Sequence, residues 1–437
     1  MMKFLFMLFF MLFMLKKNKI NSFYFNMLYI LNIMFMMNYY FMENFYLMSM
    51  YMVIDNYSFL LILLSIWIIS LMLMSLNNFE SLKIFMFIIM LIILFMFFSM
   101  KNLLMFYFFF ELSLIPIFMI IIYWGYNPER MGAAFYMLMY TLLISLPLLI
   151  YIMMIYLNNY NLDFSLLLLK NKMNLSFWSY MIIIGAFLIK LPIYLFHIWL
   201  PKAHVEAPVY GSMILAAILL KLGSYGLMRI MMIFLKSMIK YNNFIISISL
   251  IGSLIISLIC FVQIDMKSMV AYSSIVHMNL MLASLLTLSK MSFFSTYLIM
   301  ISHGLCSSGL FYMVNLYYYR SSSRLMMFNK GMINILPSFS IWWFMLCSSN
   351  FSFPLSFSFF SEIMLLSVLI NWSINFIFFL IFINFFSSIY SLYLFSYIQH
   401  GELSIMNKFN SGNFKEFIVM IFHYFPLLIM LFNMNLF

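Results

Sequence analysis

The chain has 437 residues, of which 67% are hydrophobic and only 8% charged, whereas soluble domains average roughly 45–50% apolar and 25% charged residues. This excess of apolar residues excludes a water-soluble globular protein. The formal net charge of +11 comes from basic residues that stand singly or in small groups between apolar stretches, where they set topology and contact lipid headgroups, so nucleic-acid binding is not expected.

Apolar stretches of about 18 residues or more recur along the chain between short polar segments, which is typical of serial transmembrane helices. The first, residues 4–15, lacks the small-residue cleavage site of a secretory signal and is interpreted as a retained helix. The pattern predicts an all-α polytopic membrane protein with about fourteen transmembrane helices in a single transmembrane domain, residues 1–437. The predicted centres are Met7, Ile30, Leu63, Met90, Phe110, Leu142, Lys190, Leu220, Ile251, Val276, Ser302, Asn350, Phe385 and Met420.

Two spans are predicted to be interrupted. Pro192 falls inside an apolar span, where it has no N–H to donate and its ring clashes with the carbonyl of Leu188. The stretch 331–370 is about twice as long as one span requires and carries Pro354 among serines, which indicates two half-helices around a polar gap. Nonhelical backbone survives in a bilayer only where it lines a cavity or is buried in protein. A broken span in each half of the chain therefore points to a transport path.

Four charged residues remain inside the predicted spans: Glu111, Lys190, Lys221 and Glu362. Each costs roughly 2.5–3.5 kcal/mol on insertion scales, where a neutral residue would cost less. They could be structural, as buried ion pairs or hydrogen bonds that hold helices together. We favour the alternative that they exchange protons across a hydrated interior.

Glu111 and Lys190 are expected to act together at the first broken helix. Glu111 lies among aromatic residues, and Lys190 is the candidate cation near it. Pro192 is well placed to begin a half-helix beside Lys190, so the charge on the lysine would depend on the helix dipole and on how close the Glu111 carboxylate lies.

Four further residues would continue this path. Lys221 is the next station, because the small residues around it permit close helix contact or water. His277 and His303 fall inside later spans, and imidazole can relay protons through either nitrogen. A structural role is as consistent with His277, whereas the relay is favoured for His303, which lies near several serines. Glu362, in the second broken segment, would form the far end.

No cofactor or metal site is predicted for this chain. Cys260, Cys306 and Cys347 are too scattered for a disulfide framework, and no C-x-x-C pair is present for iron–sulfur or zinc ligation. His197 and His204 have no carboxylate that completes a ligand set. No dinucleotide fingerprint or phosphate loop occurs. The other charges at predicted helix ends, where surface pairing is the default, include Glu129, Arg130, Lys202, Glu206, Asp265 and Lys267.

These residues lie in strings that resemble the subunit 4 family of NADH-ubiquinone oxidoreductase. The resemblance rests on FYFFFELSLIP (106–116), WGYNPERMGAAFYMLMYTLLISLPLL (124–149), LIKLPIYLFHIWLPKAHVEAPVYGSMILAAILLKLGSYGLMR (188–229), VQIDMKSMVAYSSIVHM (262–278) and SHGLCSSGLFY (302–312). The first fifty residues and the C-terminal end match only in character. Ser361 precedes Glu362 where many members have Gly-Glu, and Leu195 stands where a glycine is often found.

The resemblance implies a fourteen-helix, antiporter-like subunit with two inverted five-helix repeats, each containing a broken helix. We expect N-terminal helices over residues 1–80, the first repeat over 81–235, the second over 241–398 and a C-terminal helix over 399–437. It also implies that Glu111, Lys190, Lys221 and Glu362 correspond to the family's proton-path residues.

The implied function is proton translocation in respiratory complex I of the mitochondrial inner membrane, in a multi-pass subunit. NADH oxidation and ubiquinone reduction would occur in other subunits, which hold the NADH, FMN, iron–sulfur and ubiquinone sites. Neighbouring antiporter-like subunits and membrane lipids, including cardiolipin, would be its partners. The alternatives are a subunit of a multisubunit cation/proton antiporter and a passive structural subunit.

Overall fold

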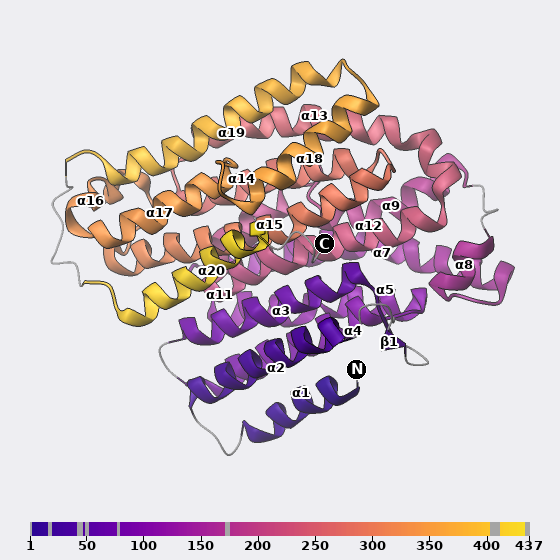
Figure 1. The fold of residues 1–437 in the computed structure, drawn as a ribbon, viewed down its shortest axis with the longest axis horizontal. Helices are drawn as coiled ribbons and strands as arrows, with labels where there is room; N and C mark the ends of the chain where they lie inside the picture. Colours follow the sequence, from indigo (N-terminus) through magenta and orange to yellow (C-terminus); the bar gives the residue numbers. More distant parts are fainter. Residues whose placement is uncertain are drawn as a thin grey trace.

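The computed structural model describes residues 2–15, 20–41, 47–48, 52–76, 79–170, 175–402 and 411–432. Within these ranges the chain forms a bundle of helices and one two-stranded antiparallel sheet (Figure 1). The elements of the N-terminal half are α1 (Met2–Met14), α2 (Asn21–Phe41), β1 (Leu47–Met48), β2 (Val53–Ile54), α3 (Asn56–Ser75), α4 (Ser81–Ser99), α5 (Leu103–Leu112), α6 (Leu114–Trp124), α7 (Arg130–Asn159), α8 (Phe164–Lys170), α9 (Phe177–Lys190), α10 (Trp199–Glu206), α11 (Val209–Ile214), the π-helix η1 (Leu215–Leu219) and α12 (Leu220–Ile233). Those of the C-terminal half are α13 (Leu235–Val262), α14 (Met266–Leu285), α15 (Lys290–Ser321), the 3-10 helix η2 (Met326–Asn329), α16 (Met332–Ile335), α17 (Pro337–Asn350), α18 (Phe357–Trp372), α19 (Phe376–Gln399) and α20 (Phe414–Phe432).

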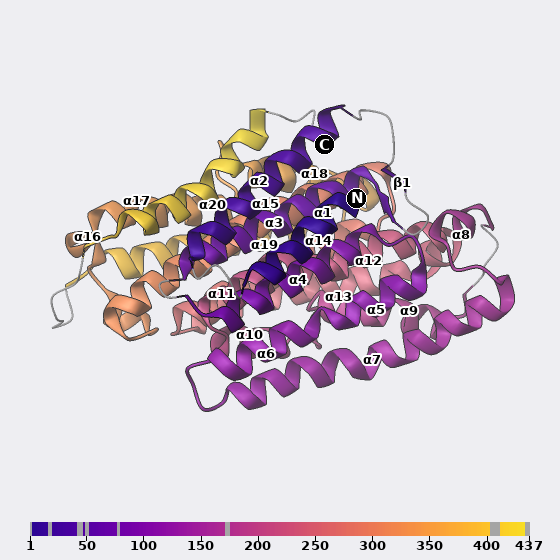
Figure 2. The same cartoon turned by 90° about the horizontal axis from the view of Figure 1, so that it is seen from below.

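Ten helical segments in the described ranges are long and apolar enough to cross a membrane. Helices satisfy their own backbone hydrogen bonds, which is why apolar spans adopt them in lipid. Each of the predicted centres lies in a helix, so the all-α polytopic class is confirmed, and the count of fourteen stays a prediction. The α15 span is 100% buried inside the bundle and the α7 span 28%, in agreement with the position of α7 along an outer edge in Figure 2.

Both predicted interruptions are present. The first break, residues 191–198, separates α9 from α10, and the second break, residues 351–356, separates α17 from α18. Pro192 lies in the first break and Pro354 in the second. The expectation that Pro192 begins a half-helix was wrong, because Pro192 lies in nonhelical backbone and the next helix, α10, begins at Trp199. The long stretch in the second half of the chain therefore does contain two helices with a nonhelical segment between them.

The two breaks share a backbone hydrogen-bond pattern at a spacing of 160 residues. In the first break the Ile193 amide donates to the Leu188 carbonyl at 3.2 Å, and in the second the Phe353 amide donates to the Ser348 carbonyl at 2.9 Å. In the first break the cause is local, because Pro192 has no N–H to offer to the carbonyl of Leu188. The amide of the next residue, Ile193, donates to the Leu188 carbonyl instead.

Positive φ angles recur at nearly the same spacing. Leu195 (φ 86°) and Leu355 (φ 81°) lie in the two breaks, and Tyr160 (φ 55°) and Ser322 (φ 53°) follow the long helices α7 and α15. Bulky residues persist in this left-handed region only where the surrounding fold holds them there. The recurrence supports two internal repeats, whose limits at 81–235 and 241–398 and whose inverted orientation stay predictions.

Candidate functional site

Lys190 is the last residue of α9 and is only 2% exposed. Its Nζ donates to the carbonyl oxygen of Phe110 at 2.5 Å and lies 3.2 Å from the centroid of the Phe110 ring. Glu111 is the next residue along α5. The ion pairs found among the described residues do not join Glu111 to Lys190, although the two groups interact electrostatically. Glu111 and Lys190 are thus close to each other, as predicted. The direct hydrogen bond of Lys190, however, goes to the backbone carbonyl of Phe110, the residue before Glu111.

Lys221 is the second residue of α12, directly after the π-helical segment η1, and is fully buried. The wider turn of η1 precedes it, and π-bulges are found frequently at functional sites. The Lys221 Nζ donates to the Ala216 carbonyl at 2.6 Å and lies 3.0 Å from the Nδ1 atom of His303 on α15. A hydrogen bond thus joins the predicted second station to the predicted relay.

The series of contacts that begins at Lys221 continues through His303 and His277 to Glu362. The rings of His303 and His277 have centroids 5.8 Å apart, and the Nδ1 atom of His277 lies 3.2 Å from the Oε1 atom of Glu362. These residues come from α15, α14 and α18. The fold therefore brings four of the predicted residues into one row, of which the first three are buried and the last is partly buried. We call it the terminal row: Lys221, His303, His277 and Glu362.

Small polar groups surround the end of the terminal row. The Ser352 hydroxyl, from the second break, donates to the Oε2 atom of Glu362, and the Tyr390 hydroxyl of α19 lies 3.4 Å from the Nε2 atom of His277. A polar cavity of about 20 Å³ is lined by both histidines and by Glu362. That volume and lining suit about one water molecule. The site can therefore hold both the ionisable groups and a water between them.

The two halves of the candidate path meet where α9 packs on α12. No hydrogen bond joins Lys190 to Lys221 among the residues that the structure describes. Gly223 of α12 sits directly against the end of α9. A Cβ atom at this position would lie 3.0 Å from the carbonyl of Phe187 and 3.2 Å from the amide of Leu191. The absence of a side chain thus allows α12 to approach the first break closely.

Two charges expected at the surface are buried, so that expectation was wrong. Lys267 is 7% exposed, and its Nζ donates to the Ala207 carbonyl at 2.5 Å. Glu206 is also buried and accepts a hydrogen bond from Asn127 at 3.1 Å. The end of α10 packs on α14 and covers these groups. His204 is buried as well, with its ring stacked on Phe311.

Sequence reasoning missed Tyr390. A tyrosine in an apolar span is ordinary, and no neighbouring charge singles it out. Its partner His277 is 113 residues away in the sequence. Ser352 was recognised only as one of several serines in the polar gap, and the left-handed φ of 55° at this residue was not foreseen. Both contacts depend on how helices are rotated about their axes.

A bundle with two broken helices and an internal row of lysine, histidine and glutamate defines the class of antiporter-like membrane subunits. Residues 100–388 match the family model described as "NADH:quinone oxidoreductase/Mrp antiporter, TM". Residues 1–81 match the model described as "NADH-ubiquinone oxidoreductase chain 4, amino terminus". The second match includes the first fifty residues, which resemble the family only in character.

Individual relatives agree. The chain is 46% identical over 442 residues to NADH-ubiquinone oxidoreductase chain 4 of Aedes aegypti, covering 100% of this chain and 99% of the relative. It is 46% identical over 376 residues to the protein of the same name in Apis mellifera ligustica, covering 86% of this chain and 84% of the relative. The chain belongs to the NADH-ubiquinone oxidoreductase chain 4 family. It is an antiporter-like, proton-translocating subunit of respiratory complex I and a multi-pass protein of the mitochondrial inner membrane.

Solved structures share the fold. A chain of respiratory complex I from Thermus thermophilus superposes with a TM-score of 0.81 at 21% identity, covering 87% of this chain and 81% of that one. A chain of the archaeal membrane-bound sulfane sulfur reductase superposes with a TM-score of 0.84 at 16% identity, covering 94% of this chain and 71% of that one. The same helical framework thus occurs in two kinds of respiratory membrane complex.

Proposed function

We propose that protons move through this chain along Glu111, Lys190, Lys221, His303, His277 and Glu362. The observation that carries the proposal is the terminal row, in which a hydrogen bond of 3.0 Å joins Lys221 to His303 and a contact of 3.2 Å joins His277 to Glu362. Ionisable groups inside a membrane are expensive, and those that face one another in a bundle mark proton relays.

The terminal row can transfer a proton stepwise. The Lys221 ammonium donates to His303, whose ring accepts at Nδ1 and can release a proton from its other nitrogen. The His303 Nε2 atom is buried and has no hydrogen-bond partner among the described residues. A water in the adjoining cavity would connect it to the His277–Glu362 pair. Glu362 would then exchange the proton at the second break.

Lys190 and Glu111 would supply the other half of the path. The Lys190 ammonium is held by the Phe110 carbonyl and ring, and the adjacent Glu111 carboxylate can neutralise it when it comes closer. Transfer from Lys190 to Lys221 then requires water or a shift of α12 against the first break. Gly223 leaves little steric resistance to such a shift, since it carries no side chain.

The energy for this transport would come from other subunits. Relatives of this chain are named NADH-ubiquinone oxidoreductase chain 4, which supports a complex that oxidises NADH and reduces ubiquinone. The FMN, iron–sulfur and NADH sites, and the site at which ubiquinone is reduced, would lie in the rest of that complex. Neighbouring antiporter-like subunits, and lipids including cardiolipin, would cover the outer surfaces of the bundle.

Replacement of Lys190 tests the proposal. Complex I carrying Lys190→Met, reconstituted in proteoliposomes, should translocate fewer protons per NADH oxidised, because the first station has lost its titratable group. The matched control is Lys236→Met, since Lys236 is exposed at the start of α13. An unchanged proton-to-electron ratio in Lys190→Met would favour a passive structural subunit. A ratio that depends on sodium would favour cation/proton antiport.

A further inference from the structure

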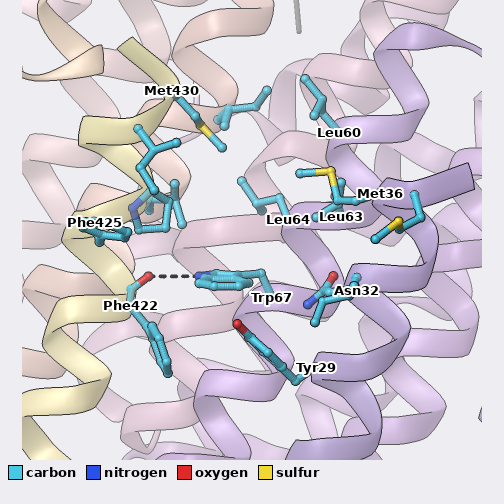
Figure 3. Close-up of a pocket in the computed structure, with 16 residues that line it drawn as sticks. Tyr29, Asn32, Met36, Leu60, Leu63, Leu64, Trp67, Phe422, Phe425 and Met430 are labelled. Carbon is cyan, nitrogen blue, oxygen red and sulfur yellow. Dashed lines mark hydrogen bonds between the residues drawn. The ribbon is translucent and has the colours of Figure 1, made fainter. Parts of the chain in front are cut away.

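An apolar pocket of about 540 Å³ lies on the bundle, and none of the proton-path residues lines it. It is formed by α2 and α3 on one side and by α20 on the other, with α15 contributing from the interior (Figure 3). Ligand pockets in proteins typically measure roughly 300–1,000 Å³ and are mostly apolar with a few placed polar groups. The size and lining of this pocket match that description.

A proline in α20 builds one wall. Pro426 lies inside the helix and has no N–H to donate to the carbonyl of Phe422, four residues earlier. The Trp67 Nε1 atom of α3 donates to that carbonyl instead, at 3.0 Å (Figure 3). The indole therefore fixes α20 to α3 at the edge of the pocket. Tyr29 lies beside it, with ring centroids 6.2 Å apart.

Asn32 contributes a side-chain amide to the lining of the pocket. It is 3% exposed, and neither its amide nitrogen nor its amide oxygen has a hydrogen-bond partner among the described residues. Figure 3 shows its amide beside the Trp67 ring, among the lining residues. A buried amide without partners costs about 1–3 kcal/mol relative to an apolar residue. A ligand that hydrogen-bonds to Asn32 would recover this free energy.

We propose that this pocket binds a quinone, a membrane-soluble ring compound with carbonyl groups and an apolar tail. Trp67 is the twelfth of the twenty residues of α3, a helix long and apolar enough to span a membrane, and Figure 3 shows the Asn32 amide beside its ring. Asn32 therefore lies near the middle of a hydrocarbon layer about 30 Å thick. The occupant must bring a polar group to that depth. A quinone carbonyl can accept from the Asn32 amide nitrogen, and a quinol hydroxyl can donate to the amide oxygen.

Phospholipids fit this position less well. Their ester groups belong to the boundary of the hydrocarbon layer and cannot reach its middle while the headgroup stays in the interface. An acyl chain alone would fill the volume and leave Asn32 unpaired. The aromatic rings of Tyr29 and Trp67, by contrast, offer faces against which a flat ring packs favourably.

Photolabelling of the intact complex tests the assignment. Purified complex I would be labelled with a photoreactive ubiquinone analogue that carries two isoprene units, and the labelled peptides of this chain would be mapped. Label is expected in α2, α3 and α20, and excess short-chain ubiquinone should displace it whereas added phospholipid should not. Asn32→Leu should reduce the labelling about fivefold to tenfold, as expected for the loss of one hydrogen bond.

Asn26→Leu is the matched control, because Asn26 is exposed on the same helix and does not line the pocket. Asn32→Leu removes an unpaired buried amide, so it should not impair folding. Equal displacement by phospholipid would assign the pocket to acyl chains and overturn the quinone proposal. Labelling elsewhere, or equal labelling of Asn32→Leu and Asn26→Leu, would overturn it as well. None of these outcomes bears on the proton path.

Discussion

The hydrogen bond between Lys221 and His303 gives the sharpest test of the terminal row. It spans 3.0 Å between two buried side chains. Among the described residues, Lys221→Met leaves His303 with no hydrogen-bond partner on either nitrogen, whereas His303→Leu leaves Lys221 bonded to Ala216. An unpaired buried polar group costs about 1–3 kcal/mol of folding free energy. Lys221→Met should therefore destabilise the protein more than His303→Leu. Loss of an acid–base group typically slows proton transfer about 10²–10⁴-fold.

Because the groups act in series, each single variant should abolish the contribution of this chain to the proton-to-electron ratio. The double variant should then be no worse than either single variant, which is the pattern expected for residues that act as a unit. The assay follows proton uptake with a pH-sensitive dye in proteoliposomes while NADH oxidation is recorded. Losses that simply add in the double variant would refute the serial row, because they would mean that the two residues serve separate paths.

Two other variants probe the surroundings of the path. Tyr390→Phe removes the hydroxyl that lies 3.4 Å from His277 and should slow proton translocation about fivefold, the effect of one hydrogen bond, whereas Tyr393→Phe on the same helix should leave it unchanged; equal rates in both would show that the hydroxyl does not position the histidine. Gly252→Ala would place a Cβ atom within 2.2 Å of a side chain of the first break and should destabilise the fold by about 1–3 kcal/mol, seen as a lower midpoint of thermal inactivation. Gly132→Ala has open space around it and should have no such effect, and a similar loss in both would contradict the packing argument.

The cost of burying charge identified most of the candidate path from the sequence. Hydrocarbon penalises ions strongly, so Glu111, Lys190, Lys221 and Glu362 stood out before any contact was known. Backbone chemistry predicted the first break in the same way, because Pro192 cannot complete a helix. These inferences needed only residue type and position within a span.

The contacts between helices could not be predicted in this way. Lys190 was expected near Glu111, and the two groups do interact. The hydrogen bond from Lys190 to the backbone carbonyl of Phe110 was not foreseen, because every residue carries such a carbonyl. Lys267 was expected at the surface, but α10 covers it. Such outcomes depend on the rotation and packing of whole helices, which the identity of a single residue does not determine.

The π-helical segment before Lys221 has a consequence for how the lysine can work. Its ammonium has an acceptor, the Ala216 carbonyl, in its own helix. The charge therefore does not depend on His303 alone for solvation, and the imidazole can rotate away without stranding an ion in hydrocarbon. Because Lys221 has this second hydrogen-bond acceptor, its bond to His303 can form and break at low energetic cost. A proton path that opens and closes requires such a bond.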